Sequence, residues 1–236
     1  MLGRMDDDQL LEEQRRFYQA RAPEYDEWWQ RVGRYDRGGD DDRRKWRRQV
    51  SVLDAALAAF DATGDVLELA GGTGWWTERL ARTAARLTVL DASAEALALN
   101  RERVGRADVD YIVDDVFEWQ PRRRYVVVFF SFWLSHVPRS HFSRFWQLVR
   151  SSLQPGGRVF LIDNRTDPIA APPVKDPYVV EYAPDLHLRR LSDGSEWRVV
   201  KVMYEPDELQ ALLGAAGWDA HIDATRWFLY GSAQPA

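Results

Sequence analysis

The sequence of 236 residues contains no cysteine, so it can form neither a disulfide nor a thiolate metal site. Its four histidines are scattered without the spacing of a metal centre, and we expect no metal. No apolar run approaches the roughly 18 residues of a membrane span and no signal peptide is recognisable, so we expect a cytoplasmic protein without membrane contact. A surplus of positive charge is also lacking, since the net charge is −5, which argues against a nucleic-acid partner.

What is present is enough apolar material for a large core. Hydrophobic residues make up 45% of the chain and charged residues 29%, which is typical of a globular domain and not of a disordered chain. The eleven tryptophans are numerous for this length, and we expect most in the core and some at a pocket. The length fits one α/β domain with a modest lid.

The first sixty residues are predicted to be mainly helical. A helix is predicted over residues 6–21, because three aspartates at its start favour the positive N-terminal end of the helix dipole. Pro23 ends it. The polar stretch at residues 38–42 is predicted to be a loop. A second amphipathic helix follows over residues 43–60, because its apolar positions recur at steps of three and four residues.

Strands and helices alternate after residue 60. Strands are predicted over residues 65–70, 87–91, 109–114, 125–132 and 158–163, with helices over 75–85, 94–103 and 140–153 between them. A helix over 206–216 and strands over 218–222 and 226–230 close the chain. This rhythm predicts a Rossmann-like doubly wound α/β sheet, mostly parallel with an antiparallel last strand.

Residues 164–205 depart from this rhythm. Several prolines are followed by two apparent strands around an Asp193-Gly194 turn, which predicts an inserted β-hairpin. We therefore expect a single domain over residues 1–236. Residues 1–45 would form a helical lid, and residues 164–205 would cover the pocket.

The first predicted strand runs into glycines at Glu68-Leu-Ala-Gly-Gly-Thr-Gly74. A dinucleotide fingerprint needs a third glycine where Thr77 stands, and a phosphate-binding loop needs a Gly-Lys-Ser or Gly-Lys-Thr sequence that is missing. The carboxylate of Glu68 is poorly placed beside a pyrophosphate but suits an ammonium or sulfonium group. The pattern disfavours a nicotinamide-dependent oxidoreductase.

These residues and three further segments resemble the class I S-adenosylmethionine (SAM)-dependent methyltransferases. The glycine segment is similar to their motif E-x-x-x-G-x-G, and Asp91 ends the second strand 17 residues after Gly74. Asp115-Val116 after the third strand and Leu153-Gln-Pro-Gly-Gly157 before the fifth resemble further family motifs. The resemblance covers nearly the whole chain and implies SAM as cofactor and S-adenosylhomocysteine (SAH) as product.

The resemblance also implies which residues hold the cofactor. The glycine segment would meet its methionine end, Asp91 its ribose hydroxyls, and Ala92, Asp115 and Val116 its adenine. We expect Ser131, at the end of the fourth strand, to contribute its backbone, and a lid tyrosine to close over the methionine carboxylate. The predicted cofactor-binding residues are Tyr18, Tyr25, Glu68, Ala70, Gly71, Gly72, Asp91, Ala92, Asp115, Val116 and Ser131.

His136 is the candidate catalytic residue. It follows the fourth strand, at the edge of the sheet where ligands bind, and an imidazole with an ordinary pKa of about 6.5 suits proton removal near neutrality. The alternative is that it only packs near the sulfonium or orders the loop. Methyl transfer itself demands mainly that the reacting atoms are held in line.

We interpret the chain as a methyltransferase acting on oxygen or nitrogen of a small molecule, such as a secondary metabolite or a quinone-like aromatic. A nucleic-acid or protein methyltransferase is an alternative, but Ser131-Phe-Trp-Leu134 stands where an Asn/Asp-Pro-Pro-aromatic motif would be expected. A non-catalytic SAM-binding module is another. The protein would be a monomer or a homodimer.

Overall fold

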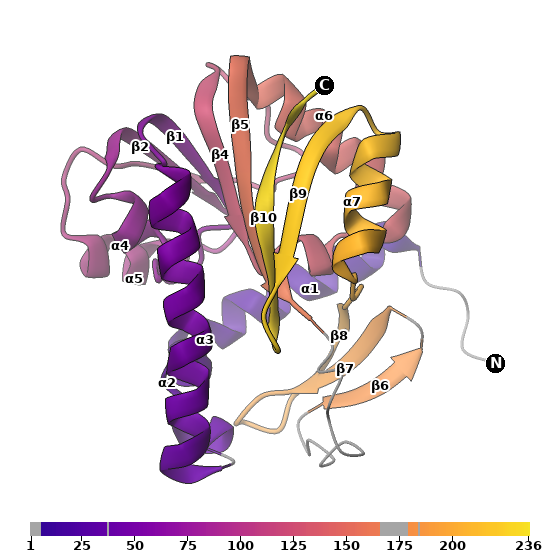
Figure 1. Ribbon diagram of the computed structural model, residues 1–236. Helices are drawn as coiled ribbons and strands as arrows, with labels where there is room; N and C mark the ends of the chain where they lie inside the picture. Colours follow the sequence, from indigo (N-terminus) through magenta and orange to yellow (C-terminus); the bar gives the residue numbers. More distant parts are fainter. Residues whose placement is uncertain (1–5, 37, 166–178, 184) are drawn as a thin grey trace.

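The computed structural model describes residues 6–36, 38–165, 179–183 and 185–236. Its centre is a seven-stranded sheet with the strand order β3-β2-β1-β4-β5-β10-β9 (Figure 1). Strands β1 to β5 are parallel, and β10 runs antiparallel to both of its neighbours, β5 and β9. The predicted mostly parallel sheet is therefore confirmed. The strands are β1 (Gly64–Leu69), β2 (Ala84–Asp91), β3 (Asp110–Val113), β4 (Tyr125–Ser131), β5 (Leu153–Asn164), β9 (Trp218–Ala224) and β10 (Phe228–Pro235).

Helices cover both faces of this sheet, which is why its central strands are apolar throughout. In β4, Val127, Val128, Phe129 and Phe130 are all fully buried, alternate side chains pointing into different hydrophobic clusters. Helix α3 packs on one face, and α6 and α7 pack on the other (Figure 1). The helices of the sheet domain are α3 (Gly39–Phe60), α4 (Thr77–Leu80), α5 (Ala94–Val104), α6 (Phe142–Ser152) and α7 (Pro206–Ala215).

Several predicted boundaries were wrong. Strand β5 begins at Leu153 and not at residue 158, and β10 extends to Pro235 and not only to residue 230. Two helices also differ. Helix α3 already begins at Gly39, so the acidic stretch expected as a loop forms its first turn, where carboxylates favour the positive helix end and Asp40 pairs with Arg43 at 2.7 Å. Helix α4 has four residues, much shorter than the predicted span of 75–85. The reason is that β2 begins early, because Ala84 pairs with Gly64 of β1.

The insertion contains a second, three-stranded antiparallel sheet made of β6 (Val179–Ala183), β7 (Leu186–Arg190) and β8 (Glu196–Val200). The predicted hairpin is confirmed as β7 and β8, which flank a turn with Gly194 at φ +87°. Strand β6 was not predicted. The proline-rich part of the predicted connection, residues 166–178, lies outside the described residues.

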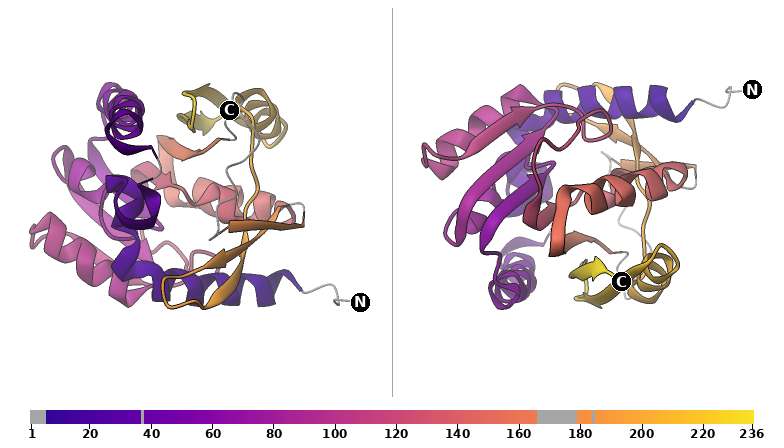
Figure 2. Two further views of the ribbon diagram at one scale, coloured as in Figure 1. Left: turned by 90° about the horizontal axis from the view of Figure 1, so that it is seen from below. Right: turned by 90° about the horizontal axis from the view of Figure 1, so that it is seen from above.

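The amino-terminal helix α1 (Asp7–Arg21) crosses beneath the carboxyl ends of the parallel strands and lies against the second sheet (Figures 1 and 2). Glu13 accepts from the guanidinium of Arg198 at 2.7 Å, and Gln14 accepts from the backbone N–H of Val200 at 3.1 Å. Together α1 and this sheet cover the edge where open α/β sheets bind ligands. Within the described ranges, the chain has no helix both long and apolar enough to cross a bilayer.

Candidate functional site

A narrow cleft lies between α1 and the carboxyl ends of β1, β2 and β4. Ten of the twelve residues predicted for the site line it, and Glu68 and Gly71 do not. The ten are Tyr18, Tyr25, Ala70, Gly72, Asp91, Ala92, Asp115, Val116, Ser131 and His136. Segments that are far apart in the sequence thus converge on one place.

The loop after β1 forms the floor of this cleft. Ala70 and Gly72 have φ values of +54° and +53°, a conformation that is uncommon for a residue with a side chain. A Cβ built on Gly72 meets no atom within 4 Å, so this position faces open space. A Cβ on Gly71 would lie 2.3 Å from Cγ1 of Val89, so Gly71 lets the loop pack on β2 and does not face the cleft.

Glu68 lies beneath this loop, and its side chain is buried with 1% exposure. Its carboxyl group hydrogen-bonds the hydroxyl of Thr77, while Oε2 has no partner among the described residues. Burial raises the pKa of Glu68 to about 8, and the charge of Asp91 adds to this shift. Glu68 therefore does not line the cleft, although it was predicted to bind the cofactor. Its carboxyl group is largely protonated at neutral pH.

Asn100 of α5 fixes the same loop and was missed in the sequence. Its amide nitrogen donates to the carbonyls of Gly71 and Gly72, each at 3.2 Å, and to the hydroxyl of Thr77 at 2.7 Å. Its amide oxygen accepts from Tyr111 at 3.1 Å. The sequence shows only an asparagine within a predicted helix. Its full burial and its hydrogen-bond partners become evident only in the fold.

Asp91 ends β2 at the wall of the cleft. Its two carboxylate oxygens accept from the backbone N–H groups of Gly72 and Ser93, both at 2.8 Å. Each oxygen has a second lone pair, so the carboxylate can accept two further hydrogen bonds from a ligand. Burial raises the pKa of Asp91, and these two backbone donors lower it.

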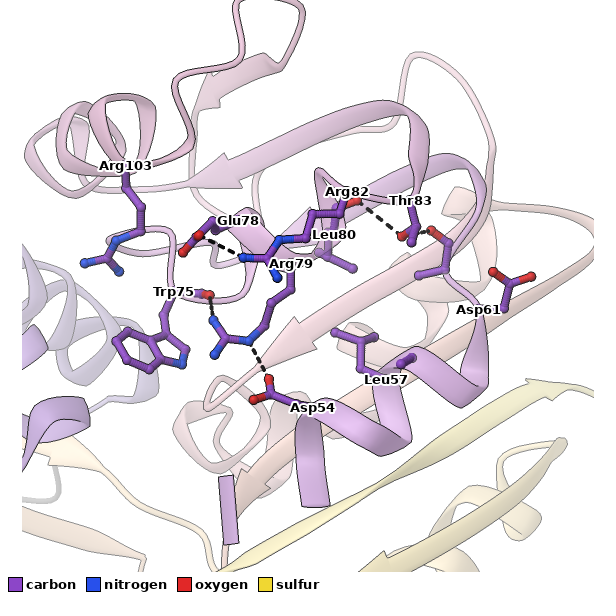
Figure 3. Close-up of a pocket in the computed structure, with 12 residues that line it drawn as sticks. Asp54, Leu57, Asp61, Trp75, Glu78, Arg79, Leu80, Arg82, Thr83 and Arg103 are labelled. Atoms are coloured by element: carbon purple, nitrogen blue, oxygen red, sulfur yellow. Dashed lines mark hydrogen bonds and ion pairs between the residues drawn. The ribbon is translucent and has the colours of Figure 1, made fainter. Parts of the chain in front are cut away.

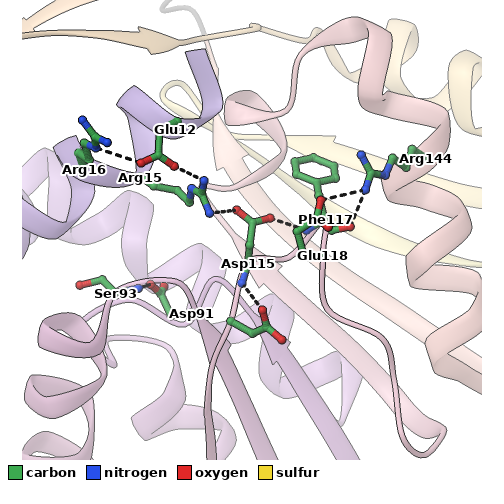
Figure 4. Close-up of polar contacts among 10 residues, drawn as sticks. Glu12, Arg15, Arg16, Asp91, Ser93, Asp115, Phe117, Glu118 and Arg144 are labelled. Atoms are coloured by element: carbon green, nitrogen blue, oxygen red, sulfur yellow. Dashed lines mark hydrogen bonds and ion pairs between the residues drawn. The ribbon is translucent and has the colours of Figure 1, made fainter. Parts of the chain in front are cut away.

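Asp115 connects the cleft to α1 (Figure 4). Its Oδ1 accepts from the N–H of Phe117 at 2.7 Å, and Oδ2 pairs with Arg15 of α1 at 3.2 Å. Arg15 was not predicted as a site residue, although it lines the cleft. The ion pair holds α1 across the opening.

His136 lies in a 3₁₀ turn, Leu134–His136, after β4 and is 4% exposed. Its Nδ1 lies 2.7 Å from the carbonyl oxygen of Val200, so this nitrogen carries the proton and Nε2 accepts from the hydroxyl of Tyr18 at 2.7 Å. Burial first, and then the charge of Lys201, lower the pKa of His136 well below its ordinary value. His136 is therefore neutral and orients Tyr18, and its role as a general base stays a prediction.

A second cavity of about 540 Å³ adjoins the cleft. Tyr18, Tyr25, Phe132 and His136 line both spaces and so form their common wall. Phe132, directly after β4, has a φ of +53°. Ala70, directly after β1, has the same uncommon left-handed backbone conformation. The arrangement provides two neighbouring compartments at the carboxyl edge of the sheet.

A third cavity of about 590 Å³ lies between α3 and α4 and contains none of the predicted site residues (Figure 3). Four of its charged side chains form two ion pairs within the lining, Arg79 with Asp54 and Arg82 with Glu78. Considering only the part of the chain that the structure describes, no cluster of three potential metal ligands occurs.

Comparison with known proteins gives a consistent result. A family model described as a methyltransferase domain matches residues 66–157. Structures of a DhpI–SAH complex and a DhpI–SAM–HEP complex are 36% identical to this chain, with TM-scores of 0.74, and cover 96% of it and 97% and 98% of their own chains. The glycopeptide N-methyltransferase MtfA, 19% identical over 80% of this chain and 90% of its own with a TM-score of 0.56, shares the fold. A search of curated proteins gave no match.

Proposed function

The chain belongs to the class I SAM-dependent methyltransferases, and from this premise we propose that it methylates an oxygen or nitrogen atom of a small molecule. SAM is its cofactor and supplies the methyl group on a positively charged sulfur. The observation that carries the proposal is the common wall between the cleft and the second cavity. Such a wall suits a cofactor on one side and an enclosed acceptor on the other.

The residues of the cleft fit this cofactor. Asp91 would accept from the two ribose hydroxyls with its remaining lone pairs, and Ala92, Asp115 and Val116 would surround the adenine. Gly72 provides the open space that a close ligand needs. Ser131, Ala70, Tyr18 and Tyr25 complete the walls.

We propose that residues 1–45 act as a lid and that the insertion at residues 164–205 covers the acceptor. The cleft encloses about 90 Å³, which is less than a nucleoside needs. Helix α1 closes the cleft through the ion pair of Arg15 with Asp115 and the hydrogen bond of Tyr18 with His136. Because Glu13 and Gln14 also bind α1 to β8, we propose that α1 and the second sheet move outward together when the cofactor enters and return behind it.

A small acceptor agrees better with the geometry than a polymer. The second cavity is bounded by α1, the segment after the short helix α2 (Asp26–Gln30), and strand β7. A nucleic acid or protein chain would have to displace these elements. One DhpI complex holds both SAM and HEP, which supports a second bound molecule beside the cofactor here. We propose a cytoplasmic monomer or homodimer without a nucleic-acid partner.

A labelling experiment tests this function. The purified protein is incubated with SAM carrying a tritiated methyl group and, in parallel, with a small-molecule extract, transfer RNA or total protein. Label in the small-molecule fraction is the expected result, with a mass increase of one methyl group replacing hydrogen. Label confined to transfer RNA or protein would contradict the proposal, and SAH binding without any labelled product would favour a non-catalytic module.

A further inference from the structure

The second cavity is strongly basic. Five cationic side chains from separate parts of the chain line it, and its described lining residues include no aspartate or glutamate. The five are Arg21 at the end of α1, Arg31 after α2, Arg165 after β5, Arg189 in β7 and Lys201 after β8. Like charges around one cavity repel each other, and a bound anion would reduce this repulsion.

Lys201 and Arg165 have carboxylate neighbours that do not line the cavity. Lys201 donates to the hydroxyl of Ser135 at 2.7 Å and lies 3.9 Å from Asp163, while Arg165 pairs with Glu205 at 2.9 Å. The third cavity differs, because arginine and carboxylate pairs line it together. In the second cavity Arg165 and Lys201 belong to the lining, whereas their partners Glu205 and Asp163 do not.

Arg21 shows the same imbalance most clearly. Its Nη2 donates to the hydroxyl of Tyr35 at 3.0 Å, and its guanidinium lies 4.8 Å from the ring centre of Tyr25. Its Nε is buried without a hydrogen-bond partner in the described structure. A guanidinium has five N–H donors, and Arg21 lines the cavity, so an oxyanion there can accept a charge-assisted hydrogen bond from it.

The titrating groups around the cavity respond to this positive charge. Burial and the neighbouring charge of Arg189 lower the pKa of His187 to about 4. Burial lowers the pKa of Lys201 to about 8, with Asp163 opposing the shift and Arg189 and Arg21 adding to it. Both groups would bind protons more readily with an anion beside them.

We propose that the methyl acceptor is itself an oxyanion, a carboxylate or a tetrahedral phosphorus or sulfur acid, bound among these basic side chains. This inference rests on the proposed function and specifies its substrate. A lone pair of the oxyanion forms the new oxygen–carbon bond while the carbon–sulfur bond breaks and its electrons go to sulfur. The acceptor loses one negative charge, the sulfonium becomes a neutral thioether, and no proton is transferred. A neutral His136 is then sufficient, because an ionised oxygen needs no base.

Binding of simple anions to the SAH complex tests the pocket. Calorimetry with inorganic phosphate and with acetate separates a tetrahedral from a planar site. We expect at least one of them to bind, and Arg21→Gln and Arg189→Gln to weaken that binding roughly tenfold or more, as loss of a charge-assisted hydrogen bond implies. The exposed Arg82→Gln is the matched control and should leave anion affinity unchanged. Arg21→Lys should retain part of the affinity.

Measuring SAH affinity shows whether these variants are folded and whether the basic residues bind the cofactor or the anion. We expect it to change less than about twofold in Arg21→Gln, because Arg21 does not line the cleft. Equal losses of SAH and anion affinity would mean that the cations hold the cofactor, and would overturn the proposal. So would a failure of both anions to bind the wild-type complex.

The charge of the labelled product separates this inference from the function on which it rests. We expect the acceptor to be retained on an anion-exchange column and the tritiated product to carry one negative charge fewer. A labelled product from a neutral or cationic acceptor would refute the oxyanion while leaving methyl transfer to a small molecule intact. Absence of any small-molecule label would instead refute the proposed function.

Discussion

Replacing Glu68 with glutamine should make the protein more stable at neutral pH. Glutamine has nearly the same shape and can keep the hydrogen bond with Thr77, but it cannot ionise. In the wild type the pKa rises from the ordinary 4.5 to about 8 because the carboxyl is buried beneath the glycine loop. Below the ordinary value both the folded and unfolded states hold the proton. Between the two values only the unfolded state releases it, so the folded state loses stability as the pH rises.

The size of the effect follows from these two pKa values. One pKa unit corresponds to about 1.4 kcal/mol, so between pH 5 and pH 7.5 the wild type should lose about 3 kcal/mol relative to Glu68→Gln. The buried position of the side chain, with 1% exposure, makes solvent screening small. Other titrating groups, Asp91 included, are common to both proteins and cancel in the difference.

Urea denaturation of both proteins at several pH values measures this difference. The free energies of unfolding should be similar near pH 4.5 and diverge steadily up to pH 8, with the variant above the wild type. Glu78→Gln, at an exposed position of α4, is the control and should show no such divergence. A difference that is constant with pH would show that Glu68 is ionised in the folded protein, and the reasoning about its burial would be wrong.

Three further predictions concern the loop and the lid. Asp91→Ala should weaken SAH binding by about 1–3 kcal/mol, measured by calorimetry, because two ribose hydroxyls lose their acceptor; an unchanged affinity would mean that the ribose lies elsewhere. Gly71→Ala should lower stability by about 1–3 kcal/mol through its clash with β2. Gly72→Ala should lower it by less, since its Cβ meets open space and only the positive φ of +53° is unfavourable; equal thermal shifts would refute this distinction. Tyr18→Phe should raise the SAH dissociation rate in stopped-flow measurements, because α1 loses its hydrogen bond to His136. An unchanged rate would show that this hydrogen bond does not keep the lid closed.

The central sheet could be predicted because its signals are local. The apolar run of β4, Tyr125–Ser131, is buried on both faces, and this alone identifies a strand in a covered parallel sheet. Asp91 and Ser131 could be placed in the cleft because the carboxyl ends of parallel strands share one edge. The length of α4 could not be predicted, since it depends on where β2 pairs with β1.

The basic cavity could not be predicted from the sequence because its residues meet only in the fold. Arg21 and Lys201 are 180 residues apart, and each alone resembles an ordinary surface charge. Gln14 is a similar case: it joins the carbonyl of His136 to the N–H of Val200, and nothing in the helical pattern distinguishes it from an exposed glutamine. Glu68 was assigned to the cleft on its motif and its charge, and only the structure shows that its side chain is buried and does not line the cleft.

A crystal structure of the protein with SAH bound most directly tests how the two compartments are used. We predict that the ribose hydroxyls lie within hydrogen-bond distance of Asp91 and that the sulfur faces the basic cavity across Tyr18 and His136. A thioether sulfur directed away from that cavity, or SAH bound outside the cleft between α1 and the ends of β1, β2 and β4, would contradict the account.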